Sequence, residues 1–226
     1  MEITEAIVTR KSIRKFKPDQ ISRDTIRKIL EIASRAPSSE NTQPWEFVVI
    51  AGETLDTVRR KNVAKIRNAE FPPDEMAHIM IERPKGSIYR TRQVEIAKQL
   101  FALMDIPRKD LQKRTEWLER GFRYFDAPVA IIIVADKSLP VEGTFLDIGS
   151  VTQNICLTAL AYGLHTCIEN QGITYSDVIR EATGIPESKR LMAAVAIGYP
   201  DWDFPANKVQ SEREPIDNIV TWCGLE

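Results

Sequence analysis

The sequence predicts a fold that combines several helices with a few buried strands in one domain, residues 1–226. The chain has 226 residues, of which 43% are hydrophobic, so it can bury a sizeable core. Residues 127–135 form an unbroken apolar run, which is typical of a strand buried on both faces. Apolar residues from Ile26 to Ala33 instead recur at helical spacing. Both kinds of element therefore contribute to one core.

The first part of the chain predicts three helices and one strand. The expected ranges are helix 3–9, helix 23–35, strand 45–50 and helix 52–68. Ser22 is a suitable N-cap for the second helix, and Pro37 ends it because the residue before a proline avoids helical geometry. The polar loop 37–43 then leads directly into a strand of β-forming residues.

An irregular segment and a charged segment occupy the middle of the chain. Prolines and a glycine interrupt residues 69–86, a pattern typical of a linker or a mobile lid. Residues 91–124 predict charged helix, interrupted near Pro107. We expect 69–124 to be an excursion over the core, because this segment is too short and too polar to form a domain.

Core elements resume after the strand at 127–135. The expected ranges are helix 146–161, a short strand ending at 169, helix 175–183 and strand 191–198. Small residues in the first helix, such as Gly149 and Ser150, allow close packing, so this helix is expected at the centre or at a subunit contact. Gly184 and Pro186 together stop the second helix.

The last segment, residues 201–226, predicts an arm. It contains Pro205 and Pro215, followed by Ile216, Ile219 and Trp222. A segment of this length cannot form its own core, so the body of the molecule or a second chain must cover the apolar side chains.

The composition argues against several classes of protein. With 31 basic and 32 acidic residues, the chain has no charge bias toward nucleic acid or a membrane surface. Cys156, Cys167 and Cys223 show neither metal-type spacing nor an even number, so we expect a reducing cytoplasm as the location. The N-terminus does not resemble a signal peptide, and the uncharged stretch 148–168 is too polar for a membrane span.

The most informative segment is Arg10-Lys11-Ser12-Ile13-Arg14. If it is extended, alternate side chains share a face, so Arg10, Ser12 and Arg14 lie together. Two guanidinium groups and a hydroxyl suit a phosphate or the polar edge of a heterocycle. The loop Pro37 to Gln43 adds amide and hydroxyl groups, which suit the uracil-like edge of an isoalloxazine ring.

Further short motifs follow these two segments in a recognisable order. Together the motifs are Arg10 to Arg14, Ala36-Pro37-Ser38-Ser39 through Asn41, Gln43-Pro44-Trp45, Gly163-Leu164, Gly184-Ile185-Pro186, Gly198-Tyr199-Pro200 and Arg213-Glu214-Pro215. With them the chain resembles the FMN-dependent nitroreductase family along its length, apart from residues 69–124. The resemblance implies an α+β fold whose mostly antiparallel sheet is flanked by helices. It also implies an intertwined homodimer with an exchanged C-terminal arm and one FMN in each of two interface sites.

The resemblance assigns cofactor-binding residues to three places. The phosphate and the ring edge would be held by Arg10, Lys11, Ser12, Arg14 and Arg213. The loop of the other subunit would lie against the flavin through Pro37, Ser38, Ser39, Asn41 and Gln43. The loop after the penultimate strand would bring backbone amides to the reactive N5 at Glu169, Asn170 and Gln171. Some members carry a lysine where this chain has Ser211.

The sequence predicts a flavoenzyme rather than an enzyme that relies on its own side chains. It shows no Ser/His/Asp set, no paired carboxylates and no nucleotide-binding glycine motif, so neither a catalytic side chain nor a metal site is expected. The expected reaction is a two-electron ping-pong cycle from NADPH or NADH, through FMN, to a small aromatic acceptor such as a nitroarene or a quinone. Two alternatives stay open, namely a reductive dehalogenase of the iodotyrosine deiodinase type and a non-catalytic protein that stores FMN.

Several other residues have simpler structural interpretations. His78 and His165 lack partner motifs, and Cys156 and Cys167 are expected to be core residues. Ser38 and Ser39 could serve only as turn caps. The basic cluster Arg108, Lys109, Lys113 and Arg114 predicts a solvated helix face, or a surface that attracts an anionic substrate or the phosphate of NADPH.

Overall fold

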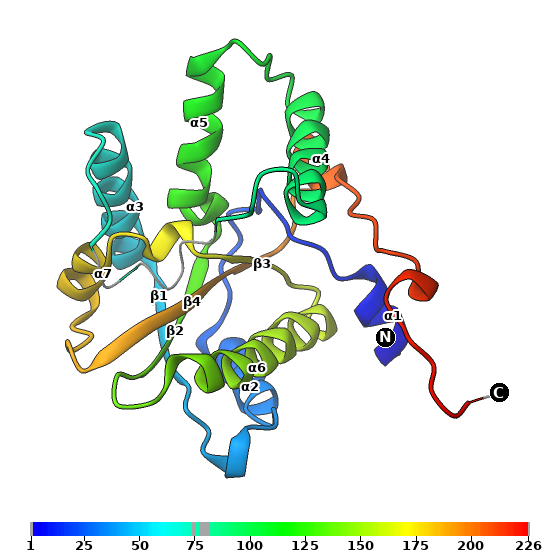
Figure 1. The fold of residues 1–226 in the computed structure, drawn as a ribbon. Helices are drawn as coiled ribbons and strands as arrows, with labels where there is room; N and C mark the ends of the chain where they lie inside the picture. Colours follow the sequence, from blue (N-terminus) through cyan, green and yellow to red (C-terminus); the bar gives the residue numbers. More distant parts are fainter. Residues whose placement is uncertain (1, 74–75, 77–81, 226) are drawn as a thin grey trace.

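A four-stranded antiparallel sheet forms the centre of the computed structural model, which describes residues 2–73, 76 and 82–225 (Figure 1). The strands lie in the order β1-β2-β4-β3 and every pairing is antiparallel. Their bounds are β1 Glu46–Ala51, β2 Val129–Asp136, β3 His165–Glu169 and β4 Lys189–Gly198. The predicted α+β class and its antiparallel sheet are confirmed.

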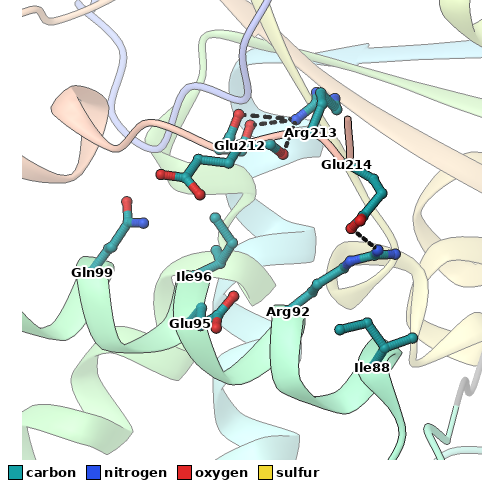
Figure 2. A pocket seen from close by; sticks show the side chains of 9 residues that line it. Ile88, Arg92, Glu95, Ile96, Gln99, Glu212, Arg213 and Glu214 are labelled. Carbon is teal, nitrogen blue, oxygen red and sulfur yellow. Dashed lines mark hydrogen bonds and ion pairs between the residues drawn. The ribbon is translucent and has the colours of Figure 1, made fainter. Parts of the chain in front are cut away.

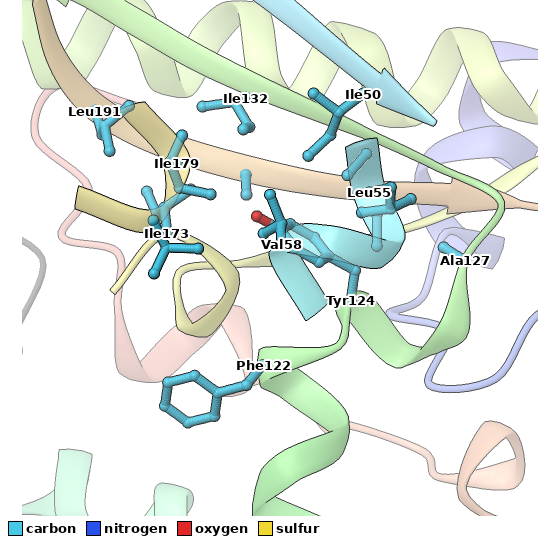
Figure 3. Packing of buried hydrophobic residues seen from close by; sticks show 14 of the residues in the cluster. Ile50, Leu55, Val58, Phe122, Tyr124, Ala127, Ile132, Ile173, Ile179 and Leu191 are labelled. Atoms are coloured by element: carbon cyan, nitrogen blue, oxygen red, sulfur yellow. The ribbon is translucent and has the colours of Figure 1, made fainter. Parts of the chain in front are cut away.

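Helices cover both faces of this sheet (Figure 1). Their bounds are α1 Ile3–Thr9, α2 Arg23–Ala33, α3 Gly52–Arg67, α4 Ile88–Leu103, α5 Leu111–Phe122, α6 Val141–Ala161 and α7 Ser176–Thr183. Helices α2 and α6 pack together on one face, and α3 packs with α7 on the other. Figure 3 shows the second of these cores, with Leu55 and Val58 of α3 next to Ile132 and Ile179.

Strand β2 explains the unbroken apolar run in the sequence. Ala130, Ile132 and Val134 belong to the core under α3 and α7, whereas Ile131 and Ile133 belong to the core under α2 and α6. Because successive side chains of a strand point to opposite faces, a strand between two cores must be apolar at every position. The predicted two-sided burial is confirmed.

Several predicted helix boundaries were wrong by a few residues, and α4 begins at Ile88 rather than at 91. Helix α2 ends at Ala33 rather than at 35, and the hydroxyl of Ser34 there donates to the carbonyl of Leu30 at 2.8 Å. Helix α6 begins at Val141 rather than at 146, after Pro140. Its first turn contains Glu142, whose charge is favourable at a helix N-terminus, although the sequence lacks apolar periodicity there.

The excursion consists mainly of α4 and α5, with Pro107 in the turn between them, as predicted. Asp110 caps α5 by accepting a hydrogen bond from the backbone of Lys113 at 2.9 Å. Helix α5 packs against α3 and the loop after β3, and α4 packs against the turn Pro205–Lys208. The two helices therefore stand over the end of β3 (Figure 1). Part of the irregular segment 69–86 lies outside the described residues.

The C-terminal arm extends from the body of the chain (Figure 1). Its large apolar side chains are exposed, with Ile219 and Trp222 each 63% accessible. In the described part of the chain, none of the helices has the length and apolar character that crossing a membrane requires.

Candidate active site

The segment that contains Ser12 runs extended beside β3. Ser12 forms a parallel bridge with Thr166, and the backbone N–H of Ile13 donates to the carbonyl of Thr166 at 3.0 Å. Ile13 is fully buried, whereas Ser12 and Arg14 line a cavity. The bridge at Ser12 agrees with the extended conformation predicted for this segment. Ser12 and Arg14 line the same cavity, but Arg10, which was expected on the same face, is not among the described residues that line it.

This cavity, of about 320 Å³, is lined by both polar and apolar residues. The polar lining residues are Ser12, Arg14, Glu169, Asn170 and Gln171. The apolar lining residues include Leu100 of α4, Trp117 and Leu118 of α5, and Phe125. A planar heterocycle with one polar edge suits such a cavity, because apolar walls hold the ring and a few polar groups orient it. The sequence did not indicate the four apolar residues.

Glu169 is the unusual group of this cavity. Its Oε2 accepts a hydrogen bond from the N–H of Gly172 at 2.9 Å, and its buried Oε1 has no partner. Burial raises the pKa of Glu169 to about 8, against the opposing effect of hydrogen bonds from Gly172 and Gln171. Burial therefore favours the protonated form of this carboxyl at neutral pH.

Gly172, whose N–H donates to Glu169, is held in place by two buried side chains. Its carbonyl accepts hydrogen bonds from the hydroxyl of Tyr124 and from Nδ2 of Asn62, both at 2.8 Å. A side chain at this position would begin 2.4 Å from the ring of Tyr124 and 2.6 Å from Oε1 of Glu169. Only glycine therefore fits between these two buried groups.

A strained turn at Tyr124 and Phe125 follows α5. Tyr124, Phe125 and Asp126 have φ values of 56°, 52° and 60°, which are unfavourable for residues with a Cβ atom. Tyr124 enters the core beneath Gly172, and Phe125 lines the cavity. The turn thus connects the end of α5 to the wall of the site.

Arg10 and Lys11 lie next to this cavity but are not among the described residues that line it. Arg10 is close enough to Cys156 of α6 for its charge to lower the pKa of that thiol, although burial raises the pKa overall. The pKa of Lys11 is lowered by partial burial and by the charge of Arg14. Arg10 is therefore near Cys156 of α6, and Lys11 is near Arg14.

The loop from Pro37 to Gln43 lies elsewhere in the chain. The N–H of Ser39 donates to Asp147 of α6 at 3.2 Å. The nine residues from Asp147 to Cys156, which is near Arg10, correspond to about 13 Å of helix. Figure 1 likewise shows the loop at the opposite side of the fold from α4 and α5. One chain therefore does not bring the two predicted segments into one cavity.

Within this loop, the exposed side chains mostly support the turn itself. Oγ of Ser38 accepts from the N–H of Gln43 at 2.9 Å, and Nε2 of Gln43 donates to the carbonyl of Asn41 at 3.1 Å. Glu40, Asn41 and Gln43 have φ values between 47° and 59°. Ser38 is thus a turn cap in the chain as described, which was the simpler of its two interpretations.

Arg213 lines a second cavity, between α4 and the arm (Figure 2). Its Nη1 donates to the carbonyl and hydroxyl oxygens of Ser211 and to the carbonyl of Glu212, at 2.9 to 3.0 Å. Beside it, Glu214 pairs with Arg92 of α4. Arg213 and Arg14 therefore lie in separate cavities within one chain.

The other candidate residues have structural surroundings. His165 packs edge-on against Trp202 at 4.9 Å between ring centroids, and burial raises the pKa of the Cys167 thiol to about 12. His78 lies outside the described residues. Across residues 2–73, 76 and 82–225, no cluster of His, Cys, Asp and Glu side chains could hold a metal ion.

Comparison with known proteins shows similarity over the whole chain. The family model described as "Nitroreductase family" matches residues 7–199. A nitrobenzene nitroreductase from Ectopseudomonas oleovorans is 32% identical over 97% of this chain and 96% of its own. A 4-nitrobenzoate reductase from Nocardioides sp. (strain LMS-CY) is 28% identical over 98% of this chain and 90% of its own. Among solved structures, the FMN and NADPH-dependent nitroreductase NfnB from sphigopyxis sp. strain HMH superposes with a TM-score of 0.91 at 28% identity, covering 100% of both chains.

Proposed function

The chain belongs to the nitroreductase family, and from this premise we propose that it is an FMN-dependent oxidoreductase. It would use NADPH or NADH to reduce nitroaromatics, quinones or related electron-poor acceptors. The observation that carries the proposal is the cavity in which Ser12 and Arg14 meet the end of β3 below an apolar wall. When bound, FMN supplies the two-electron chemistry, since it can accept hydride from a nicotinamide and deliver it to an acceptor.

The polar residues of the cavity suit the negative charge that would develop on the flavin when it is reduced. Arg14 provides a positive charge, which would stabilise negative charge that develops nearby. Glu169 is mainly neutral at pH 7 because its pKa is about 8, so this carboxyl does not add an opposing negative charge. Ser12, Asn170 and Gln171 contribute neutral groups that can orient a heterocycle.

We propose that the excursion 69–124 acts as the cover of this site within a single domain. Leu100 of α4 and Trp117 and Leu118 of α5 are the excursion side chains that line the cavity. Apolar side chains in this position would exclude water from the reacting groups and favour a flat aromatic acceptor.

We also propose that a second copy of the chain completes each site. The loop residues Pro37, Ser38, Ser39, Asn41 and Gln43 would come from the partner, and Arg10, Lys11 and Arg213 would serve the phosphate. The distance along α6 between the two segments supports this arrangement. So do the apolar side chains that the single chain leaves exposed on α1, α6 and the arm, such as Val8, Leu146 and Trp222.

A cytoplasmic location is part of the same proposal. Cys156, Cys167 and Cys223 are free thiols in the structure, and burial raises the pKa of the first two, which keeps them unreactive.

Purified protein is expected to be yellow and to release FMN on denaturation. Anaerobic addition of NADPH should bleach the flavin absorbance, and a nitroarene or a quinone should restore it. A halophenol added in parallel tests the dehalogenase alternative, which predicts reoxidation by that compound alone. A flavin that NADPH and NADH both fail to bleach would favour storage, and a colourless protein that takes up no FMN would refute the proposal.

A further inference from the structure

The backbone of Arg14 is held from both sides by side chains distant in sequence. Its N–H donates to Oδ1 of Asn207 at 2.6 Å, and its carbonyl accepts from Nη2 of Arg120 at 3.0 Å. The segment around it makes only isolated bridges, at Ser12 and at Phe16. Sheet hydrogen bonds therefore do not orient the peptide groups of Arg14. The side chains of Asn207 and Arg120 provide hydrogen bonds to these groups instead.

Both the oxygen and the nitrogen of the Asn207 side-chain amide make hydrogen bonds to the backbone. Besides accepting from Arg14, its Nδ2 donates to the carbonyl of Lys15 at 2.9 Å and to that of Asp201 at 2.7 Å. The residue is only 1% exposed. An asparagine amide offers one acceptor oxygen and two N–H groups, and here each has a partner. Removing the amide would leave the half-buried N–H of Arg14 without this acceptor, whereas the carbonyls of Lys15 and Asp201 keep hydrogen bonds from the N–H groups of Asp201 and Phe204.

Arg120 is held in turn by its own neighbours. Its guanidinium lies 4.6 Å from the ring centroid of Phe204, and Nη1 is 3.5 Å from Oδ2 of Asp126. Asp126 also pairs with Lys15 at 3.2 Å and with Arg123 at 3.0 Å. Burial alone would raise the pKa of Asp126, but the hydrogen bond from Arg123 and the surrounding cations bring it below its usual value. The carboxylate therefore stays ionised and keeps Arg120 in place.

We propose that Asn207, together with Arg120, is a positioning residue that determines where the guanidinium of Arg14 lies in the cofactor cavity. Arg14 lines the cavity, whereas Asn207 is not among the described residues that do, so Asn207 acts through Arg14. The inference rests on the proposed function, because it concerns how this chain binds FMN. It also gives the segment after β4 a role in the site, since that segment supplies Asn207, Asp201 and Phe204.

The test is a double-mutant cycle on FMN affinity. Apoprotein is titrated with FMN, and the loss of flavin fluorescence gives Kd for the parent, Asn207→Ala, Arg14→Ala and the double variant. Each single variant is expected to bind FMN about tenfold more weakly. The double variant should bind no more weakly than Arg14→Ala. If Asn207 acts only by placing the Arg14 guanidinium, its removal has no further effect once that guanidinium is absent. Additive losses, or parent-like affinity in Asn207→Ala, would overturn the proposal.

Two further variants separate positioning from general stability. Ile133→Ala removes buried atoms from the other face of β2, in the core under α2 and α6, which contains none of the residues that line the cavity. It should lower the unfolding midpoint and leave the FMN affinity unchanged. Arg120→Lys keeps the charge that faces Asp126 but not the planar fork that reaches Arg14, so it should also weaken FMN binding, even if Asn207→Ala does not fold. A parent that binds no FMN refutes the proposed function itself, whereas a binding parent with parent-like Asn207 and Arg120 variants refutes only this inference.

Discussion

Dimers that combine an Arg14→Ala chain with an Asn41→Asp chain are expected to recover one FMN site of parental affinity. Each variant by itself should form dimers that bind FMN at least about tenfold more weakly at both sites, because each loses a polar contact or gains a repulsive charge. In the mixed dimer, one site receives the intact Arg14 and the intact loop from different chains. The other site receives both substitutions.

The physical reason is the separation of the two segments on α6. Ser39 is bonded near the start of this helix at Asp147, and Arg10 lies near Cys156. The loop must therefore reach a cavity in a second copy if it is to touch the flavin at all. Differently tagged chains can be co-expressed and purified over both tags, and the mixed dimers then titrated with FMN.

Mixed dimers of the parent with each variant are the matched controls, and each should show one parental and one weakened site. Two weak sites in the Arg14/Asn41 mixed dimer would mean that Arg14 and Asn41 serve the same site from one chain. That result would contradict the shared site but not FMN binding itself.

Replacing Glu169 with Gln is expected to change how stability depends on pH. In the folded protein the pKa of Glu169 is raised from 4.5 to about 8 by burial. Between these values the folded chain retains a proton that the unfolded chain has released, so the free energy of unfolding falls as pH rises. Glu169→Gln cannot titrate, and its oxygen can still accept from Gly172. Relative to the parent, it should gain on the order of 4 kcal/mol between about pH 4.5 and pH 8.

Urea unfolding of the apoprotein at several pH values between 5 and 9 measures this difference. The matched control is Glu142→Gln, the same exchange at an exposed position in the first turn of α6. The control should follow the parental pH dependence. Parallel curves for Glu169→Gln and the parent would show that Glu169 is ionised across the whole range.

Local sequence patterns were sufficient for most elements of the fold. The unbroken apolar run at 129–135 predicted a strand buried on both faces, because such a strand is apolar at every position and shows no alternation with polar residues. Ser22 and Gly184 marked helix ends through caps that involve only neighbouring residues. The start of α6 escaped prediction because its first turn shows no apolar periodicity in the sequence.

The candidate site was predictable only in part. The alternation in Arg10 to Arg14 predicted that Arg10, Ser12 and Arg14 share a face, and the structure brings Ser12 and Arg14, but not Arg10, to one cavity. The apolar wall from Leu100, Trp117 and Leu118 left no signal, because these residues lie on helices whose sequences indicate mainly charged, solvated faces. Their role depends on how α4 and α5 stand over β3.

The sequence by itself determined which segments carry the donors and cations, since residue types and short spacings are local properties. Only the tertiary structure brought Asn207 to the backbone of Arg14, a contact across 193 positions, and buried Glu169 so that its pKa is raised. Neither could be read from the chain, because long-range hydrogen bonds and burial depend on all the elements that meet at one place.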